Sequence, residues 1–329
     1  MKGGKLKYTT SMEANKKPSL SIVIPVFNEQ DILPELHQRL NNAAKQITDS
    51  YELIFINDGS RDNTFPILKQ LAGNDKHVRY LSFSRNFGHQ IAVTAGLDNC
   101  KGEGVGIIDG DLQDPPELIP EMYAKYKKGF KVVYAKRVKR KGETFLKKFT
   151  AKIFYRLLKK ITSVDIPLDT GDFRLIDKEI VEYLKQMPEQ NKFLRGQIAW
   201  LGFSQTFVNF ERDSRNTGKT NYSIRKMVRL AMDGITAFSD VPLKFATTLG
   251  FIVSLVAFLI ILYALFSFFV LERTITGWTS LIISTMFIGG IQLLALGIIG
   301  EYISRINTNM RDRPLYIIDQ TNIIDDSQQ

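Results

Sequence analysis

The most informative run in this chain is Val105-Gly106-Ile107-Ile108-Asp109-Gly110-Asp111-Leu112-Gln113-Asp114-Pro115-Pro116. A short apolar run that ends in acids is typical of a buried parallel strand, which delivers carboxylates to the edge of a sheet where α/β folds bind their ligands. Asp109 and Asp111 are two residues apart, so on a strand they leave the same face, with Gln113 in register, and share one divalent cation. The simpler alternative is a strand that runs into an acidic turn.

Length and composition limit the possible classes of protein. With 329 residues, 44% of them hydrophobic, the chain can build one large domain and still have apolar sequence left over at its C-terminal end. A single cysteine, Cys100, excludes a disulfide framework and suits a reducing compartment. The net charge of +10 favours an anionic partner, such as nucleic acid, a lipid surface or phosphorylated substrates. Residues 1–18 are predicted to be a disordered leader and carry no signal-peptide core.

Outward from the acidic run, the first half of the chain repeats one pattern. Apolar strands are predicted at 20–27, 51–56 and 78–83 and before Asp109, and helices at 32–47 and 89–98. Each strand ends in a polar turn. Four such units predict a doubly wound α/β sheet with right-handed crossovers, whose turns lie on one edge and bring Glu29, Asp58, Asp109 and Asp111 together.

Two common nucleotide-binding motifs are missing from this pattern. No G-x-G-x-x-G follows the first strand and no Walker A lysine loop is present. Their absence counts against a dinucleotide oxidoreductase and a P-loop NTPase. A nucleotide held by carboxylates, with a metal ion on its phosphates, stays open.

Four polar turns carry a resemblance to a known family. They are Pro25-Val26-Phe27-Asn28-Glu29, Asn57-Asp58-Gly59-Ser60, Arg85-Asn86-Phe87-Gly88 and the run from Asp109 to Glu117. In this order they resemble the motifs of family 2 glycosyltransferases, and within that family the polyisoprenyl-phosphate hexosyltransferases, such as dolichol-phosphate mannose synthase and the bactoprenol glucosyltransferases. The resemblance implies a GT-A (Rossmann-like) nucleotide-sugar domain, for which we expect residues 19–220.

The resemblance also implies roles for the residues of the turns. Pro25, Glu29 and Asp58 would contact the nucleoside of a sugar nucleotide, with Asp58 reading the base, and Asn28 is counted with them. Simpler roles stay open, since Pro25 can end a strand, Asn28 can cap a helix and the 85–88 turn can be a plain turn.

For the acidic run, the resemblance places Asp109 against the ribose or the sugar. It implies that Asp111 and Gln113 hold Mg²⁺ or Mn²⁺ on the diphosphate, and the strand register adds Asp109 to this metal site. A metal ion suits this place because a departing nucleoside diphosphate develops charge on its oxygens.

A second block, residues 169–175, resembles the family segment beside the sugar and the acceptor. Asp169 and Asp172 are the candidates for a general base, or else they position the sugar or basic side chains. A strong base is not required, because a phosphate monoester is largely ionised at pH 7. Arg174, together with Arg137 and Arg140 from the basic run at 136–141, is a candidate ligand for an acceptor phosphate.

After the acidic run, residues 131–134 are predicted to form a further strand, and two basic segments follow. Residues 144–160 form a basic amphipathic pattern that suits a bilayer surface, with an ordinary core-facing helix as the alternative. Residues 211–220 resemble a flexible loop of the family, in which Arg212, Arg215 and Lys219 bind phosphate oxygens or stay solvated. A juxtamembrane amphipathic helix is expected over residues 221–242.

The C-terminal part contains two long apolar segments, 245–270 and 277–300, without a charged residue. Either exceeds the roughly 30 Å hydrocarbon core of a bilayer, so residues 243–303 are predicted to be a two-helix transmembrane hairpin. The distribution of Lys and Arg places the catalytic domain, both termini and the tail at 304–329 on the cytoplasmic side of the plasma (inner) membrane. Small residues of the second span allow either a homo-oligomer or close packing within one hairpin. Residues 314–318 are expected to return to the soluble domain as a strand.

Together these features predict a metal-dependent hexosyltransferase with a polyprenyl phosphate acceptor, undecaprenyl phosphate. The resemblance implies that the reaction inverts the anomeric carbon and that the donor is UDP-glucose. The alternatives are a mannose synthase that uses GDP-mannose, a processive polysaccharide synthase and a non-enzymatic membrane scaffold. The processive polysaccharide synthase is disfavoured because Gln197-Ile198-Ala199-Trp200 matches the Gln-x-x-Arg-Trp signature of that group only in part. Nucleic-acid binding is disfavoured because the basic residues cluster at the membrane boundary. His37, His77 and His89 show no ligand spacing and are expected to be surface or core residues.

Overall fold

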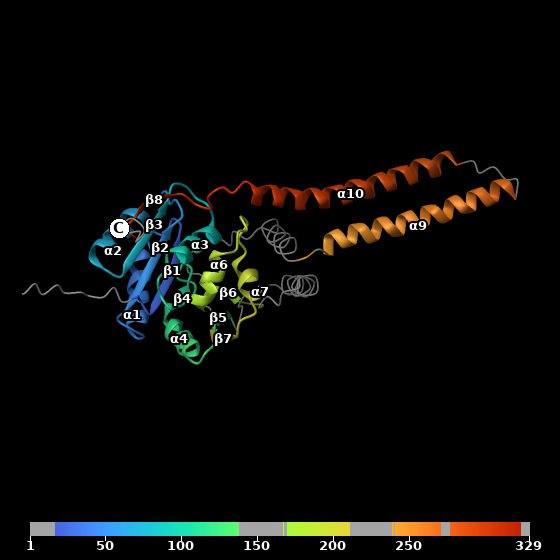
Figure 1. The fold of residues 1–329 in the computed structure, drawn as a ribbon. Helices are drawn as coiled ribbons and strands as arrows, with labels where there is room; N and C mark the ends of the chain where they lie inside the picture. The colour runs from blue at the N-terminus through green and yellow to red at the C-terminus, as the bar shows by residue number, and fades with distance from the viewer. Residues whose placement is uncertain are drawn as a thin grey trace, which may run out of the picture.

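The computed structural model describes residues 17–137, 167, 170–210, 239, 241–270 and 277–323. These residues form an α/β domain from which two long helices extend (Figure 1). The domain is built on one sheet with the strand order β7-β5-β6-β4-β1-β2-β3-β8. The strands are β1 Leu20–Val26, β2 Tyr51–Asn57, β3 Val78–Phe83, β4 Gly104–Ile107, β5 Val132–Arg137, β6 Thr170–Asp177, β7 Gln205–Phe210 and β8 Ile318–Thr321.

The parallel part of the sheet confirms the predicted strand and helix units. Strand β1 pairs in parallel with β2 on one side and β4 on the other, and β2 pairs in parallel with β3. The helices that follow β1, β2 and β3 are α1 Leu33–Lys45, α2 Thr64–Asn74 and α3 His89–Asn99. The predicted bounds therefore agree with the observed elements to within a few residues.

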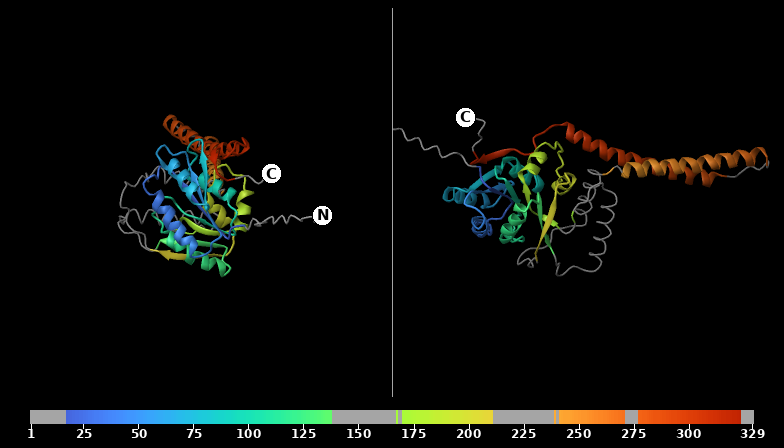
Figure 2. Two further views of the ribbon diagram at one scale, coloured as in Figure 1. Left: turned by 90° about the vertical axis from the view of Figure 1, so that its left-hand side faces the viewer. Right: turned by 60° about the horizontal axis from the view of Figure 1, so that its bottom comes forward.

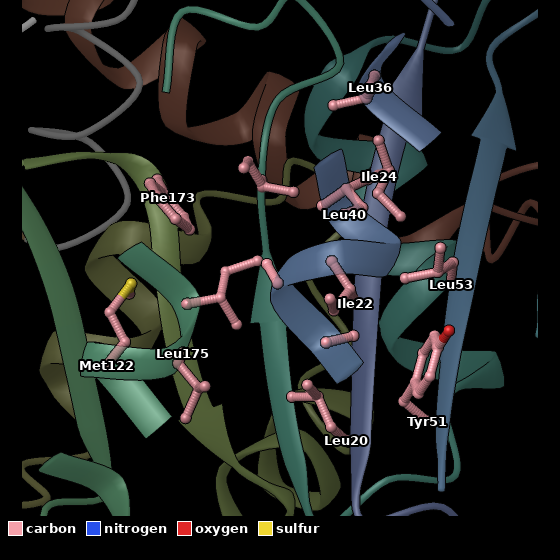
Figure 3. Packing of buried hydrophobic residues seen from close by; sticks show 14 of the residues in the cluster. Leu20, Ile22, Ile24, Leu36, Leu40, Tyr51, Leu53, Met122, Phe173 and Leu175 are labelled. Carbon is pink, nitrogen blue, oxygen red and sulfur yellow. The ribbon is translucent and has the colours of Figure 1, made fainter. Parts of the chain in front are cut away.

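Both faces of this parallel part are buried, which explains why its strands are continuous apolar runs. Ile22 and Ile24 of β1 pack with Leu36 and Leu40 of α1 in one core cluster (Figure 3). Val23 points to the opposite face, where its cluster includes residues of α3. The alternation along β1 thus fixes which helix covers which face.

In the other part of the sheet, β6 is antiparallel to its neighbours, and neither β6 nor β7 was predicted. Strand β6 runs antiparallel to both β4 and β5, whereas β5 and β7 are parallel. The helical elements here are η1 Pro116–Leu118, α4 Ile119–Lys127, α6 Lys178–Lys185 and α7 Leu194–Trp200. Met122 of α4 lies in the same core cluster as Phe173 and Leu175 of β6 (Figure 3). The sheet is therefore mixed, and only β5, expected at 131–134, was foreseen in this part.

Two long helices, α9 Val241–Phe269 and α10 Trp278–Met310, run side by side away from the domain (Figures 1 and 2). Their segments Val241–Ile260 and Ser284–Met310 are long and apolar enough to cross a membrane. A Cβ atom added at Gly289, Gly290 or Gly297 would meet nothing within 4 Å among the described residues. Packing within this hairpin therefore gives these glycines no close helix contact, and the homo-oligomer stays a prediction.

The tail returns to the soluble domain, as expected, and adds β8 to the edge of the sheet. Strand β8 pairs antiparallel with β3, and the ring of Tyr316 stacks on Phe83 at 5.2 Å. The hydroxyl of Tyr316 donates to Asp98 Oδ2 at 3.0 Å. The strand begins at Ile318, where the expected one ends.

Several predicted features lie outside the described residues. They are the leader up to residue 16, the amphipathic helix at 144–160, the loop at 211–220, most of the juxtamembrane segment at 221–242, and the candidate site residues Asp169, Arg140, Arg212, Arg215 and Lys219.

Candidate active site

A cleft of about 350 Å³ opens beyond the carboxyl ends of β1, β2 and β4, beside the start of α3. Parallel α/β sheets place their ligand sites at this edge. Five of the predicted residues line the cleft, namely Pro25, Glu29, Asp58, Asp109 and Asp111. The sequence therefore identified the main acids of this site, although they belong to three different strand ends.

The route by which Asp109 and Asp111 reach the cleft differs from the prediction. Strand β4 ends at Ile107, so the strand register that was expected to join Asp109, Asp111 and Gln113 is wrong. Asp111 Oδ1 accepts a hydrogen bond from the Gln113 backbone N–H at 3.1 Å, and Leu112 has a positive φ of 54°. A turn therefore brings the two acids into the cleft, and Gln113 is not among the residues that line it.

The third acid of the run has another role. Asp114 is buried, and Arg137 Nη2 donates to its two carboxylate oxygens at 3.1 and 3.3 Å. Arg137 was predicted to bind an acceptor phosphate. In the structure its guanidinium is paired with the Asp114 carboxylate.

Asp58 fixes the turn between β3 and α3. Its Oδ1 accepts from the Phe87 backbone N–H at 2.7 Å, and its Oδ2 accepts from Gly88 N–H at 3.0 Å. Burial raises the pKa of Asp58, and these two hydrogen bonds offset the rise only in part. The neighbouring Gly59 has a φ of 68°, and a Cβ there would lie 2.4 Å from the Arg85 carbonyl carbon. Asp58 and Gly59 thus set the shape of one wall of the cleft.

Asn28 joins two turns instead of lining the cleft. Its side-chain oxygen accepts from Arg61 N–H at 2.9 Å, and its own N–H donates to Ser60 Oγ at 3.0 Å. Neither bond belongs to the cap of α1, which has no side-chain cap. Asn28 therefore supports the Glu29 turn from outside the cleft-lining set.

His89, expected to be an ordinary surface or core residue, instead lies between two acids. Its Nε2 lies 3.5 Å from Asp109 Oδ1 and 3.3 Å from Asp172 Oδ2. Burial would lower the pKa of His89, but the hydrogen bond with Asp172 and the charges of both acids outweigh burial and raise it. The only signal for His89 in the sequence was its position directly after the polar turn that follows β3.

Asp172 of β6 is held by several donors from different elements. Its Oδ1 accepts from Arg174 Nη2 at 2.8 Å and from Arg195 Nε at 3.0 Å. Its Oδ2 accepts from Gln90 Nε2 at 3.4 Å. Burial would raise the pKa of Asp172, but His89 and the two arginines hold it well below its usual range. Asp172 is therefore a poor general base and a good positioning residue, which is the second of its two predicted roles.

Arg174 lies too deep for its predicted contact with an acceptor phosphate. Its side chain is 1% exposed, compared with 32% for Arg195. Its Nη2 also donates to the Gly171 carbonyl at 3.2 Å. Because the guanidinium is enclosed by its own strand, we correct its role to that of a counter-ion beneath Asp172. The exposed member of the pair, Arg195, was missed.

The acids at the open end of the cleft fit a hard divalent cation. Burial raises the pKa of Asp109 to about 6, and its Oδ1 has no hydrogen-bond partner among the described residues. Asp111 lines the same cleft. One ligand atom each from His89, Asp109 and Asp172 also lie within 4.8 Å of one another. Carboxylate oxygens are the ligands that Mg²⁺ and Mn²⁺ prefer, so Asp109 and Asp111 are compatible with either metal.

The fold and the cleft define an α/β protein with an acid-lined ligand site at the carboxyl edge of its sheet. The sequence model described as "Glycosyl transferase family 2" matches residues 21–184. The chain is 51% identical to the glycosyltransferase YkcC of Bacillus subtilis (strain 168), over 92% of this chain and 93% of that protein. This chain therefore belongs to glycosyltransferase family 2, and it is an enzyme of that class.

Relatives with a more specific name align over almost the whole chain. The prophage bactoprenol glucosyl transferase homolog of Escherichia coli (strain K12) is 40% identical, over 91% of this chain and 98% of that protein. Among solved structures, glucosyl-3-phosphoglycerate synthase from Mycobacterium tuberculosis has a TM-score of 0.44 at 16% identity, over 67% of this chain and 77% of that chain. At that distance the likeness carries no information on ligands.

Proposed function

We propose that this glycosyltransferase moves glucose from UDP-glucose to undecaprenyl phosphate, in a metal-dependent reaction with inversion at the anomeric carbon. The observation that carries the proposal is the presence, in one chain, of an acid-lined cleft and two helices long enough to cross a membrane. A water-soluble donor and a membrane-embedded acceptor need these two features together. The name and full-length alignment of the bactoprenol glucosyl transferase homolog support the same acceptor.

In this proposal the donor occupies the cleft. Pro25, Glu29 and Asp58 contact the nucleoside, and Asp109 and Asp111 face the diphosphate and the hexose. A divalent cation on these acids, with Gln113 close by, would neutralise the charge that develops on the departing nucleoside diphosphate. His89 keeps Asp109 and Asp172 together at the end of the cleft, which orients the acids before the donor enters.

The acceptor phosphate then displaces the nucleoside diphosphate in one step. A phosphate oxygen of the acceptor forms the new bond to the anomeric carbon, from the face opposite the leaving group. The bond between that carbon and the diphosphate oxygen breaks, and its electron pair leaves with UDP. Because the attacking phosphate is already ionised at pH 7, no side chain has to remove a proton, which agrees with the low pKa of Asp172.

The proposal places the hairpin α9–α10 across the plasma membrane, with the catalytic domain and both termini in the cytoplasm. The cations that flank the two apolar segments support this orientation. The site then opens to the side where nucleotide sugars are made. A homo-oligomer through the hairpins is a further expectation of this arrangement.

A transfer assay tests the proposed function. Purified protein receives radiolabelled UDP-glucose or GDP-mannose with undecaprenyl phosphate, in Mn²⁺ or in EDTA, and label in the organic phase is counted. We expect label from UDP-glucose that EDTA abolishes. Label from GDP-mannose alone would make the protein a mannose synthase, and no label from either donor would contradict a hexosyltransferase of this acceptor.

A further inference from the structure

Asp172 connects the donor cleft to helix α7, which lies beyond the residues that the family model matches. One of its oxygens faces His89, a residue of the cleft wall, at 3.3 Å. The other accepts from Arg195 of α7 at 3.0 Å. Gln90 adds a second connection, since its Nε2 donates to Asp172 and its Oε1 accepts from the Leu194 N–H at 3.3 Å. The start of α7 is thus tied to the wall of the cleft at His89.

Among the arginines that the structure describes near Asp172 and Asp114, Arg195 is the best placed to meet an acceptor phosphate. An acceptor phosphate carries between one and two negative charges and pairs best with an arginine fork. Arg174 is almost fully enclosed, and Arg137 lies against the buried Asp114. Arg195 contacts Asp172 through Nε, and about a third of its side chain is open to solvent. It is the more exposed of the two arginines that contact Asp172.

Helix α7 also follows a segment that contacts the membrane hairpin. The Gln190 N–H donates to Asn309 Oδ1 of α10 at 3.1 Å. Asn309 lies eight residues beyond Glu301, the first charged residue after the apolar segment, which is about 12 Å along the helix. The headgroup layer is about 5 to 7 Å thick on each side of a bilayer. The chain just before α7 is therefore held close to the layer that contains lipid phosphates.

We propose that Arg195 binds the phosphate of the lipid acceptor, and that Asp172 and Gln90 are positioning residues that hold α7 for this contact. The inference rests on the proposed function for the identity of the acceptor. It assigns the acceptor phosphate to the boundary between the cleft and α7, on the side of Asp172 opposite His89. The nucleoside of the donor is assigned to the cleft itself, which Arg195 does not line.

The test compares Arg195→Gln and Arg195→Lys with the wild type and with Arg39→Gln. Arg39 is a matched control because it pairs with Glu117 on the surface, away from the cleft. Full-length protein in detergent is titrated with undecaprenyl phosphate, undecaprenol, inorganic phosphate and UDP, and the KM values for donor and acceptor are measured separately.

We expect Arg195→Gln to weaken undecaprenyl phosphate binding and to raise the acceptor KM by about 10- to 100-fold. UDP binding and the donor KM should stay within about twofold, and Arg195→Lys should recover part of the loss because it restores the charge without the fork. Undecaprenol has no phosphate, so its affinity should be the same for the wild type and for Arg195→Gln. Arg39→Gln should resemble the wild type.

Three results would overturn the inference. They are equal undecaprenyl phosphate affinity in Arg195→Gln and the wild type, a rise in the donor KM instead of the acceptor KM, and binding of inorganic phosphate at Arg195 without binding of the lipid phosphate. A wild type that binds the lipid phosphate through Arg195 but transfers no sugar would contradict the proposed function and leave this inference standing.

Discussion

At the scale of single residues, the acids around the cleft differ in the hydrogen bonds and ion pairs that their carboxylates make within the protein. Asp58 is engaged by two backbone N–H groups and Asp172 by two arginines, whereas Asp109 has a carboxylate oxygen without a hydrogen-bond partner among the described residues. Asp58 and Asp172 shape the site, and Asp109 keeps one carboxylate oxygen for a ligand. The same residue type therefore serves two purposes within one site.

Asp111 separates the metal role from a structural role. In Asp111→Asn the side-chain oxygen can still accept the hydrogen bond from Gln113 N–H, so the turn should persist while the charge is lost. We expect a loss of metal-dependent turnover of about 100-fold or more in Asp111→Ala and in Asp111→Asn. Asp172→Asn should retain UDP affinity, because Asp172 does not line the cleft. The transfer assay in Mn²⁺ measures the loss of turnover, and calorimetric titration of UDP in Mn²⁺ measures the affinity. Unchanged UDP affinity in the Asp111 variants would rule out a metal site there.

Gly59 tests the wall that Asp58 builds. Gly59→Ala forces a side chain into a left-handed backbone conformation and against the Arg85 backbone, so we expect a loss of about 1 to 2 kcal/mol in unfolding free energy and weaker UDP binding. Gly73→Ala in α2 is the matched control, since a Cβ there meets no atom within 4 Å. It should gain about 0.5 to 1 kcal/mol. Equal thermal shifts in the two variants would contradict the assigned geometry.

At the scale of elements, the sequence predicted the strands and helices that local patterns of apolar and polar residues determine. Strands β1 to β4 and their helices follow from apolar runs and polar turns. Strand β6 was missed because Asp172 and Arg174, which interrupt an apolar run, neutralise each other only once the strand is in place. His89 and Arg195 were missed for a related reason. Their partner Asp172 is remote in the sequence, and no local spacing encodes that contact.

Asp75, directly after α2, connects this helix with α1 and with the start of β3, and the stability that these contacts contribute depends on pH. It accepts from His37 and Asn41 of α1 and from His77, directly before β3. Burial would raise the pKa of Asp75, but these hydrogen bonds hold it far below its usual range. A lowered carboxyl pKa gives stability that is complete above the unfolded pKa, about 3.9, and is lost as pH falls further.

We therefore expect Asp75→Asn to cost about 1 to 3 kcal/mol at pH 7, since it removes hydrogen bonds to a charged group. The difference from the wild type should shrink as pH falls below about 4, where the wild-type carboxyl begins to lose its advantage. Thermal unfolding between pH 3 and pH 8 measures this difference. A gap that stays constant over this range would contradict the role given to the charge of Asp75.

At the scale of the whole molecule, the chain leaves the α/β domain, forms the long helical pair and returns to the domain. The return is fixed by β8 on the edge of β3 and by the Gln190 contact with α10. The domain and the hairpin are therefore joined by these two contacts as well as by the chain itself. In a membrane they would hold the acid cleft at a set distance from the acceptor.

In the proposed reaction, the cleft transfers one hexose to a lipid phosphate and releases one nucleoside diphosphate. The most direct measurement incubates the full-length protein with UDP-glucose, undecaprenyl phosphate and Mn²⁺, and quantifies UDP and the lipid product by mass spectrometry. We expect a lipid that has gained one hexose residue, in an amount equal to the UDP released. Release of UDP without the glycosylated lipid, or no conversion by a protein that binds both substrates, would contradict it.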